Sequence, residues 1–237
     1  MNLVKLSEER IANFGETTSL VYQGETYTNI RIDKMGRRLA AGLTSLGVGR
    51  GDHVVVSMPN SPEVFACFGA IWRIGAVIVP IMFLLGEDET RYILDHSDAK
   101  AVITSQDLLG KMEKACEGIT HIQHIIVLNG ENQGDRVDFY GLVDANSPLE
   151  TFEEMADNDT ALMIYTSGTT GRPKGVMLSH NNLYSNAVAT WNAAKTDKPD
   201  VSILCLPLAH SFGVVVMNAG NVSPFKESYG VLPVSYT

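Results

Sequence analysis

Residues 165–175 read YTSGTTGRPKG, and this stretch decides how the chain is interpreted. It follows an apolar run, residues 161–165, that is typical of a buried strand. It is rich in hydroxyl side chains, glycines and cations: Thr166, Ser167, Gly168, Thr169, Thr170, Gly171, Arg172, Lys174 and Gly175. Glycine lets backbone N–H groups approach an anion, hydroxyls donate further hydrogen bonds, and lysine supplies a positive charge. The stretch therefore predicts a phosphate-binding loop, suited to a nucleoside triphosphate.

A plain surface turn between two strands is the simplest alternative. It would explain a lone pair of glycines, but not hydroxyls, two cations and a preceding strand together. The loop is also not of the Walker type, which needs Gly-Lys-Ser/Thr shortly after the first glycine. Here Gly168 is followed by Thr169-Thr170-Gly171-Arg172-Pro173.

Composition favours a folded protein and argues against nucleic-acid binding. Apolar residues make up 45% of the 237 residues and charged residues 19%, with a net charge of −9 and no lysine or arginine cluster. Cys67, Cys116 and Cys205 are odd in number and lie far apart, which predicts buried thiols in a reduced, cytoplasmic protein. The N-terminal residues lack the order of a signal peptide.

One apolar segment, residues 64–86, is long enough to cross a membrane. Arg73 lies near its middle, and a central arginine costs about 2.5–3.5 kcal/mol on insertion scales. Gly75 and Pro80 interrupt it as well. We therefore expect a buried helix, a turn and a short strand, with Ser61 capping the helix and Pro62 in its first turn.

Strand and helix patterns alternate along the chain. Apolar residues recur at helical spacing over residues 29–46, with Gly47 in the position of a C-terminal cap. Valine-rich and isoleucine-rich runs at 53–58, 101–104 and 124–128 predict buried strands, and helices are expected at 87–96 and 106–117. Residues 129–158 are interpreted as a polar connection. The alternation predicts an α/β fold with predominantly parallel sheets flanked by helices.

Three stretches carry a resemblance to a known family. The sequence YTSGTTGRPKGVMLSHNNL at 165–183 is similar to the phosphate-binding signature of the adenylate-forming, or AMP-binding, superfamily. LPLAHSFG at 206–213 resembles the acyl-pocket motif of its acyl-CoA synthetases, and residues 24–81 resemble the N-terminal region. The chain thus resembles the N-terminal portion of a long-chain fatty-acid–CoA ligase.

The resemblance implies ATP-dependent activation of a carboxylic acid to an acyl-adenylate, and then to a coenzyme A thioester. ATP, magnesium and coenzyme A are the implied small molecules, with no nucleic acid and no membrane span. The phosphate site would comprise Thr166, Ser167, Gly168, Thr169, Thr170, Gly171, Lys174 and Gly175. Lys174, Thr166 and His210 would be the catalytic residues, and Thr166 would also belong to the metal site.

The acyl pocket would comprise His210, Ser211, Phe212 and Gly213, after a strand at 203–208. Ser211-Phe212-Gly213 is expected to be flexible. Amino-acid-activating relatives carry an aspartate near this position, whereas residues 211–216 contain no acid, so a fatty or aryl acid is favoured. His180 is expected at a helix start capped by Ser179 or Asn181, and His121 and His124 are not expected to bind metal.

The family's downstream segments do not appear in this sequence. They are the Tyr-Gly-x-Thr-Glu segment, the ribose-binding aspartate and the C-terminal lysine. The expected organisation is an α/β lobe at 1–150, a phosphate-loop and acyl-pocket segment at 151–220, and a tail at 221–237 outside the family pattern, without a C-terminal lid. We therefore expect a truncated product with little activity alone. Three possibilities stay open: a ligase, alone or with a complementing chain; a non-catalytic nucleotide-binding remnant; and a structural or interaction protein.

Overall fold

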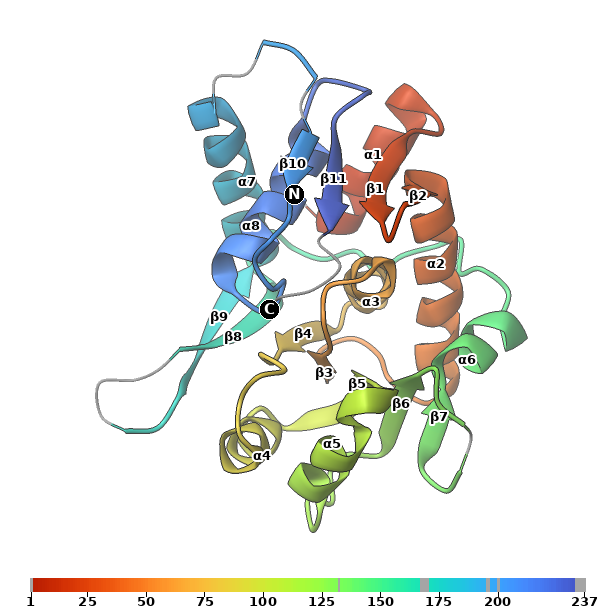
Figure 1. The fold of residues 1–237 in the computed structure, drawn as a ribbon, viewed down its shortest axis with the longest axis vertical. Helices are drawn as coiled ribbons and strands as arrows, with labels where there is room; N and C mark the ends of the chain where they lie inside the picture. Colours follow the sequence, from red (N-terminus) through yellow and green to blue (C-terminus); the bar gives the residue numbers. More distant parts are fainter. Residues whose placement is uncertain (1, 132, 167–170, 195–196, 200, 233–237) are drawn as a thin grey trace.

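The computed structural model describes residues 2–131, 133–166, 171–194, 197–199 and 201–232. Its larger sheet has seven strands in the order β7-β6-β5-β3-β4-β8-β9 (Figure 1). Their bounds are β3 His53–Ser57, β4 Val77–Pro80, β5 Ala99–Ser105, β6 His124–Leu128, β7 Arg136–Asp138, β8 Thr160–Thr166 and β9 Lys174–Ser179. Neighbouring strands are parallel except β8 and β9, which form an antiparallel hairpin.

Helices cover both faces of this sheet, as its fully buried strands require. On one face lie α2 (Asn29–Ser45), α3 (Pro62–Arg73) and α6 (Phe139–Ala145), whose apolar side chains join one core cluster. On the other lie α4 (Glu87–His96), the short 3₁₀ turn η1 (Gln106–Leu108) and α5 (Leu109–Cys116). The predicted α/β fold is therefore confirmed.

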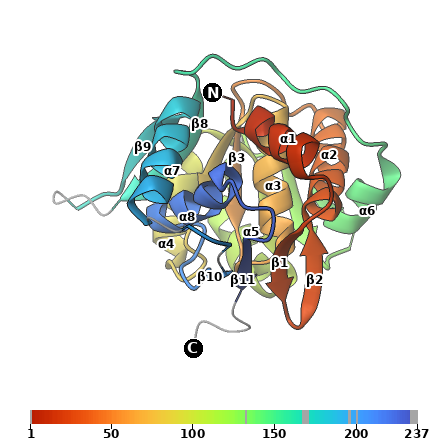
Figure 2. The same ribbon diagram turned by 90° about the horizontal axis from the view of Figure 1, so that it is seen from above.

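A second sheet has four strands in the order β10-β11-β1-β2 (Figure 2). Its bounds are β1 Thr18–Tyr22, β2 Glu25–Thr28, β10 Val201–Ile203 and β11 Tyr229–Leu232. The helices α1 (Leu3–Phe14), α7 (His180–Ala194) and α8 (Ser211–Val222) complete the described elements. Strand β11 pairs in parallel with β1 at the opposite end of the chain. The predicted tail therefore contributes a strand to this sheet.

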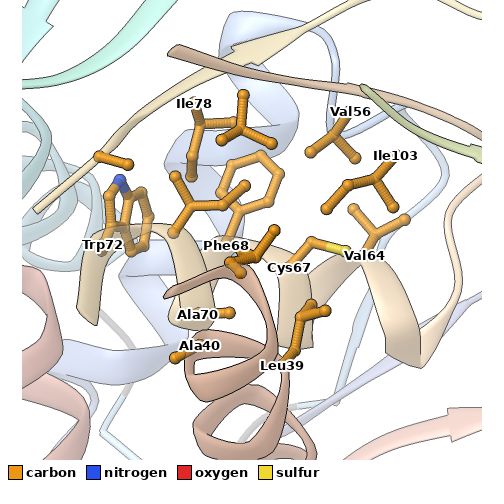
Figure 3. Close-up of a cluster of buried hydrophobic side chains, with 14 of the residues drawn as sticks. Leu39, Ala40, Val56, Val64, Cys67, Phe68, Ala70, Trp72, Ile78 and Ile103 are labelled. Carbon is orange, nitrogen blue, oxygen red and sulfur yellow. The ribbon is translucent and has the colours of Figure 1, made fainter. Parts of the chain in front are cut away.

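Helix α3 forms the centre of the core. Its side chains Cys67, Phe68 and Trp72 are nearly or fully buried between the large sheet and α2, as Figure 3 shows. The Trp72 indole N–H donates a 2.9 Å hydrogen bond to the Ala161 carbonyl oxygen, which ties α3 to β8. The expected sequence of buried helix, turn and short strand is confirmed, with Pro62 in the first helical turn.

Two other details differ from expectation. Ser61 occupies the N-cap position of α3, but its hydroxyl makes no capping hydrogen bond. Of the cysteines, Cys67 is buried and Cys205 is exposed, so the expectation of buried thiols is wrong for Cys205. Burial raises the pKa of the Cys67 thiol.

The other predicted elements agree closely with the structure, apart from residues 129–158 and the strand expected at 203–208, where β10 covers Val201–Ile203 instead. The expected helix at 87–96 and the strand at 124–128 match α4 and β6, and Gly47 has φ +80° after α2. The polar connection is wrong in part, because residues 129–158 contain β7 and α6. Helix α6 forms because the Asp138 carboxylate accepts a hydrogen bond from the Gly141 N–H and Phe139 is fully buried.

Within the described residues, no helix is both long and apolar enough to cross a lipid bilayer.

Candidate functional site

The β8–β9 hairpin carries the glycine-rich motif and extends away from the body of the molecule (Figure 1). Thr166 ends β8, Lys174 begins β9, and the two residues are direct cross-strand partners. Both are exposed. The hairpin therefore places one hydroxyl and one ammonium group side by side at the two ends of the connecting loop. Of the predicted phosphate-binding residues, Ser167, Gly168, Thr169 and Thr170 lie outside the described residues.

Gly171 and Gly175 lie within the described residues, and each position requires glycine for a different structural reason. Gly171 has φ +104°, a backbone conformation that residues other than glycine rarely adopt. At Gly175, a Cβ atom would lie 3.2 Å from Cζ of Tyr165 and 3.1 Å from Sδ of Met163. Gly175 thus leaves room for the Tyr165 ring across the hairpin.

The motif follows the carboxyl end of a parallel strand, where ligands bind in open α/β sheets. Strand β8 is parallel to β4, and β4 to β3, so their carboxyl ends share one edge of the sheet. Asn60, three residues beyond β3, is 3% exposed and holds the LPLAHSFG segment at this edge. Its amide nitrogen donates to the Leu206 carbonyl (2.9 Å), and its Oδ1 accepts from the Leu208 N–H (2.8 Å).

The LPLAHSFG segment differs locally from expectation. Strand β10 ends at Ile203, and only the Leu204 N–H continues the pairing, to the Val231 carbonyl at 2.9 Å. His210 is exposed and precedes α8, and its carbonyl accepts from the Val214 N–H at 3.3 Å. Residues 211–213 are therefore the first turn of α8, where a flexible stretch was expected.

Ser211 and Gly213 lie in that first turn. Ser211 is exposed, whereas Gly213 is buried against residues 207–208. A Cβ atom on Gly213 would clash with the Pro207 carbonyl oxygen and lie 3.1 Å from Cα of Leu208. Phe212 belongs to the same turn, and its side chain lies outside the described atoms. Gly213, itself one of the predicted pocket residues, therefore has a packing role in the LPLAHSFG motif.

His180, His121 and His124, the other histidines considered in the sequence, make contacts that serve the fold. His180 starts α7 and is fully buried, and Ser179 Oγ caps this helix by accepting from the Asn182 N–H at 3.2 Å, as predicted. His121 and His124 contact the carbonyl oxygens of Leu94 and Leu46. Among the residues that the structure describes, no group of three or more His, Cys, Asp or Glu side chains could hold a metal ion.

Sequence reasoning missed two residues that organise this site. The sequence prediction does not include Asn60, although an asparagine in the loop that follows a strand is a signal for a side chain that hydrogen-bonds the backbone. His96, on the last turn of α4, lies 2.8 Å through Nδ1 from the Tyr165 hydroxyl. No local pattern distinguishes His96 from any other exposed histidine.

Together the fold and this edge of the sheet define the class of protein. The sequence profile of the AMP-binding enzyme family matches residues 7–223, so the chain belongs to the AMP-binding enzyme family.

Two groups of curated relatives are CoA ligases. The crotonobetaine/carnitine–CoA ligase of Citrobacter koseri is 28% identical over 96% of this chain and 47% of its own length. A medium/long-chain-fatty-acid–CoA/3-oxocholest-4-en-26-oate–CoA ligase of Mycobacterium marinum is 28% identical over 78% of this chain and 35% of its own length. The chain thus spans about a third to a half of these relatives.

Solved structures share the fold. A long-chain-fatty-acid–CoA ligase from Archaeoglobus fulgidus superimposes with a TM-score of 0.86 at 27% identity, covering 98% of this chain and 47% of that chain. An anthranilate–CoA ligase in complex with anthranoyl-AMP has a TM-score of 0.88 at 23% identity, covering 99% of this chain and 45% of that chain. The second likeness, at its lower identity, establishes the fold alone.

Proposed function

We propose that this chain binds the polyphosphate of ATP and serves the ATP-dependent activation of a carboxylic acid. A carboxylate oxygen attacks the α-phosphorus, the bond from that phosphorus to the bridging oxygen breaks, and pyrophosphate leaves. The product is an acyl-adenylate. The thiol of coenzyme A then attacks its carbonyl carbon, and AMP leaves. The observation that carries this proposal is the pairing of Thr166 with Lys174 at the ligand-binding edge of the sheet.

The residues of the motif act by position and charge, with no protein nucleophile. The Lys174 ammonium neutralises charge on the departing pyrophosphate, and the Thr166 hydroxyl donates to a phosphate oxygen. Backbone and hydroxyl groups supply the remaining donors: Ser167, Gly168, Thr169, Thr170, Gly171 and Gly175. His210 is exposed just before α8, and its proposed role is to line the acyl site beside the α-phosphate.

Magnesium fits the donors at this edge. Mg²⁺ in nucleotide sites is held by one or two protein oxygens together with substrate phosphates and water, and needs no cage of protein ligands. The exposed Thr166 hydroxyl is an oxygen of this kind. When bound, the ion would neutralise phosphate charge and orient the triphosphate.

An apolar acid, fatty in the first instance, is the proposed substrate. The segment after His210 continues as Ser211-Phe212-Gly213-Val214-Val215-Val216, without an acidic residue to pair a substrate ammonium group. The relatives named for fatty acids agree with this choice. We further propose that residues 1–150 and 151–220 act as a supporting lobe and a ligand-binding segment of one AMP-binding domain.

The test combines binding with turnover. Binding of Mg·ATP and Mg·pyrophosphate to the full chain is measured by calorimetry, and carboxylate-dependent ATP–pyrophosphate exchange is measured with fatty and aryl acids. Lys174→Ala is expected to weaken pyrophosphate binding about tenfold or more, because a charge-assisted contact is lost. Lys34→Ala, an exposed lysine on α2, is the matched control.

The two readouts separate the parts of the proposal. Binding that Lys174→Ala weakens and Lys34→Ala does not supports the phosphate site, and exchange supports acid activation. Binding without exchange would leave a nucleotide-binding module and contradict catalysis by this chain alone. Equal binding by the unmodified chain and Lys174→Ala would contradict the assigned phosphate site.

A further inference from the structure

The last turn of α4 lies against the strand that enters the phosphate motif. Nδ1 of His96 lies 2.8 Å from the hydroxyl of Tyr165, the last residue but one of β8. Their rings meet edge to face, with centroids 5.7 Å apart and planes at 84°. This contact joins residues 69 positions apart in the sequence. It lies directly beside Thr166.

The Tyr165 ring is held on its other sides as well. It packs with Tyr92 and Met163 against the apolar cluster beneath α4 and α5. Gly175, its cross-strand partner, has no Cβ that would press on the ring. Burial raises the pKa of Tyr165 to about 12, so the phenol keeps its proton at neutral pH and can donate to the imidazole.

The other end of the motif contacts the same helix. The Arg172 guanidinium carbon lies 5.4 Å from the centroid of the Tyr92 ring, within the range of a cation–π contact. Tyr92 is four residues before His96, so both face the same side of α4, and their rings are 5.2 Å apart. Helix α4 thus contacts the entry to the loop through His96 and the exit through Tyr92.

We propose that His96 is a positioning residue for polyphosphate binding: its contact with Tyr165 fixes the end of β8, and thereby the Thr166–Lys174 pair. The inference rests on the proposed function. His96 itself touches no phosphate. Without the nitrogen of His96, the Tyr165 phenol loses its partner and β8 can change its twist at Thr166, which misaligns the two groups that would hold the polyphosphate.

The test is a double-mutant cycle on the full chain, with Mg·pyrophosphate as the probe and calorimetry as the measurement. His96→Phe keeps a ring against Tyr92 and Tyr165 but removes the nitrogen, and Tyr165→Phe removes the hydroxyl. Each is expected to weaken binding about three- to tenfold, as for one hydrogen bond, and the double variant no more than either single one. His96→Asn, which keeps a polar group near the position of Nδ1, is expected to bind within about twofold of the unmodified chain.

A second readout separates positioning from general stability. The imidazole ¹⁵N resonances of His96 are expected to shift on addition of Mg·pyrophosphate, and those of His121 to stay unchanged. His121→Phe, a half-buried histidine away from the motif, is the control for binding. Even if His96→Phe fails to fold, Tyr165→Phe and His96→Asn still carry the comparison.

The outcomes distinguish this inference from the proposed function. Pyrophosphate binding that is unchanged in His96→Phe and Tyr165→Phe, or losses that simply add in the double variant, would overturn the positioning role and leave the phosphate site intact. Absence of any binding by the unmodified chain would overturn the proposed function, and the positioning role with it.

Discussion

The Arg73 guanidinium lies 2.7 Å from the Glu8 carboxylate, although the Arg73 side chain is only 3% exposed. This contact joins the end of α3 to α1. The same guanidinium donates to the carbonyl oxygens of Leu149 (3.4 Å) and Thr151 (3.1 Å), and lies 3.6 Å from Asp33 of α2. The charge that made a membrane span unfavourable therefore holds two helices and the segment before β8 around the end of α3.

Replacing Arg73 should destabilise the fold strongly. Arg73→Met is expected to lower the free energy of unfolding by about 3–5 kcal/mol, because Glu8 keeps only Arg37 as a partner and two carbonyls lose donors. Arg50→Met, which removes an exposed pair with Asp159, is expected to cost less than about 1 kcal/mol. Urea titration monitored by circular dichroism measures both. A loss at Arg73 no larger than that at Arg50 would contradict the central role of this charge.

Asn60→Ala should release the LPLAHSFG segment from the sheet edge. Two hydrogen bonds disappear, a partly buried one to the Leu206 carbonyl and a buried one from the Leu208 N–H. Leaving the buried Leu208 N–H unsatisfied costs about 1–3 kcal/mol. Hydrogen exchange is the direct measurement, because the Leu208 amide donates to the Asn60 side chain and should exchange faster in the variant. Asn192→Ala, an exposed position on α7, serves as the control. Unchanged protection of Leu208 would show that other contacts hold the segment.

Two glycines of α8 offer a matched comparison. A Cβ on Gly213 would meet the backbone of Pro207 and Leu208, whereas a Cβ on Gly220 would meet nothing within 4 Å. Gly213→Ala is therefore expected to lower the melting temperature by several degrees, since α8 must move away from residues 207–208. Gly220→Ala is expected to leave it unchanged or raise it slightly, because alanine favours helix. Similar shifts in both variants would rule out the tight approach at Gly213.

The elements that sequence patterns predicted are those with long, regular periodicity or dense β-branched runs. The helices at 29–46 and 87–96 and the strand at 124–128 fall in this group. Helix α6 was not predicted because its seven residues span only two turns, which is too few for a periodic signal. The first turn of α8 was not predicted because serine and glycine favour loops locally, and here burial of Val214 and Met217 overrides that preference.

The candidate site could be predicted where its residues are contiguous in the sequence. Thr166 and Lys174 carry the signal of one loop, and the hairpin register pairs them. Asn60 and His96 act on partners 146 and 69 residues away, and an isolated polar residue carries no information about so distant a partner. Long-range hydrogen bonds of this kind depend on the strand order, which local patterns do not specify.

His180 should make stability depend on pH. Its side chain is fully buried at the start of α7, and Nδ1 lies 3.4 Å from the Leu3 backbone nitrogen. Burial lowers the pKa of His180 to about 4, and the nearby Asp159 opposes this only in part. The imidazole is therefore neutral in the folded protein at every pH above about 4.

The sign of the effect follows from proton binding. In the unfolded chain His180 takes up a proton near pH 6.5, its ordinary value, whereas the folded protein resists protonation down to about pH 4. The unfolded state thus binds more protons in this window, and stability falls as the pH drops from about 6.5 to 4, by up to about 3 kcal/mol. His180→Phe keeps a buried ring and should remove this share of the pH dependence. Urea titrations of both proteins from pH 7.5 to 4.5 measure the difference between their slopes, and parallel slopes would mean that His180 takes up its proton at the same pH in the folded and unfolded states.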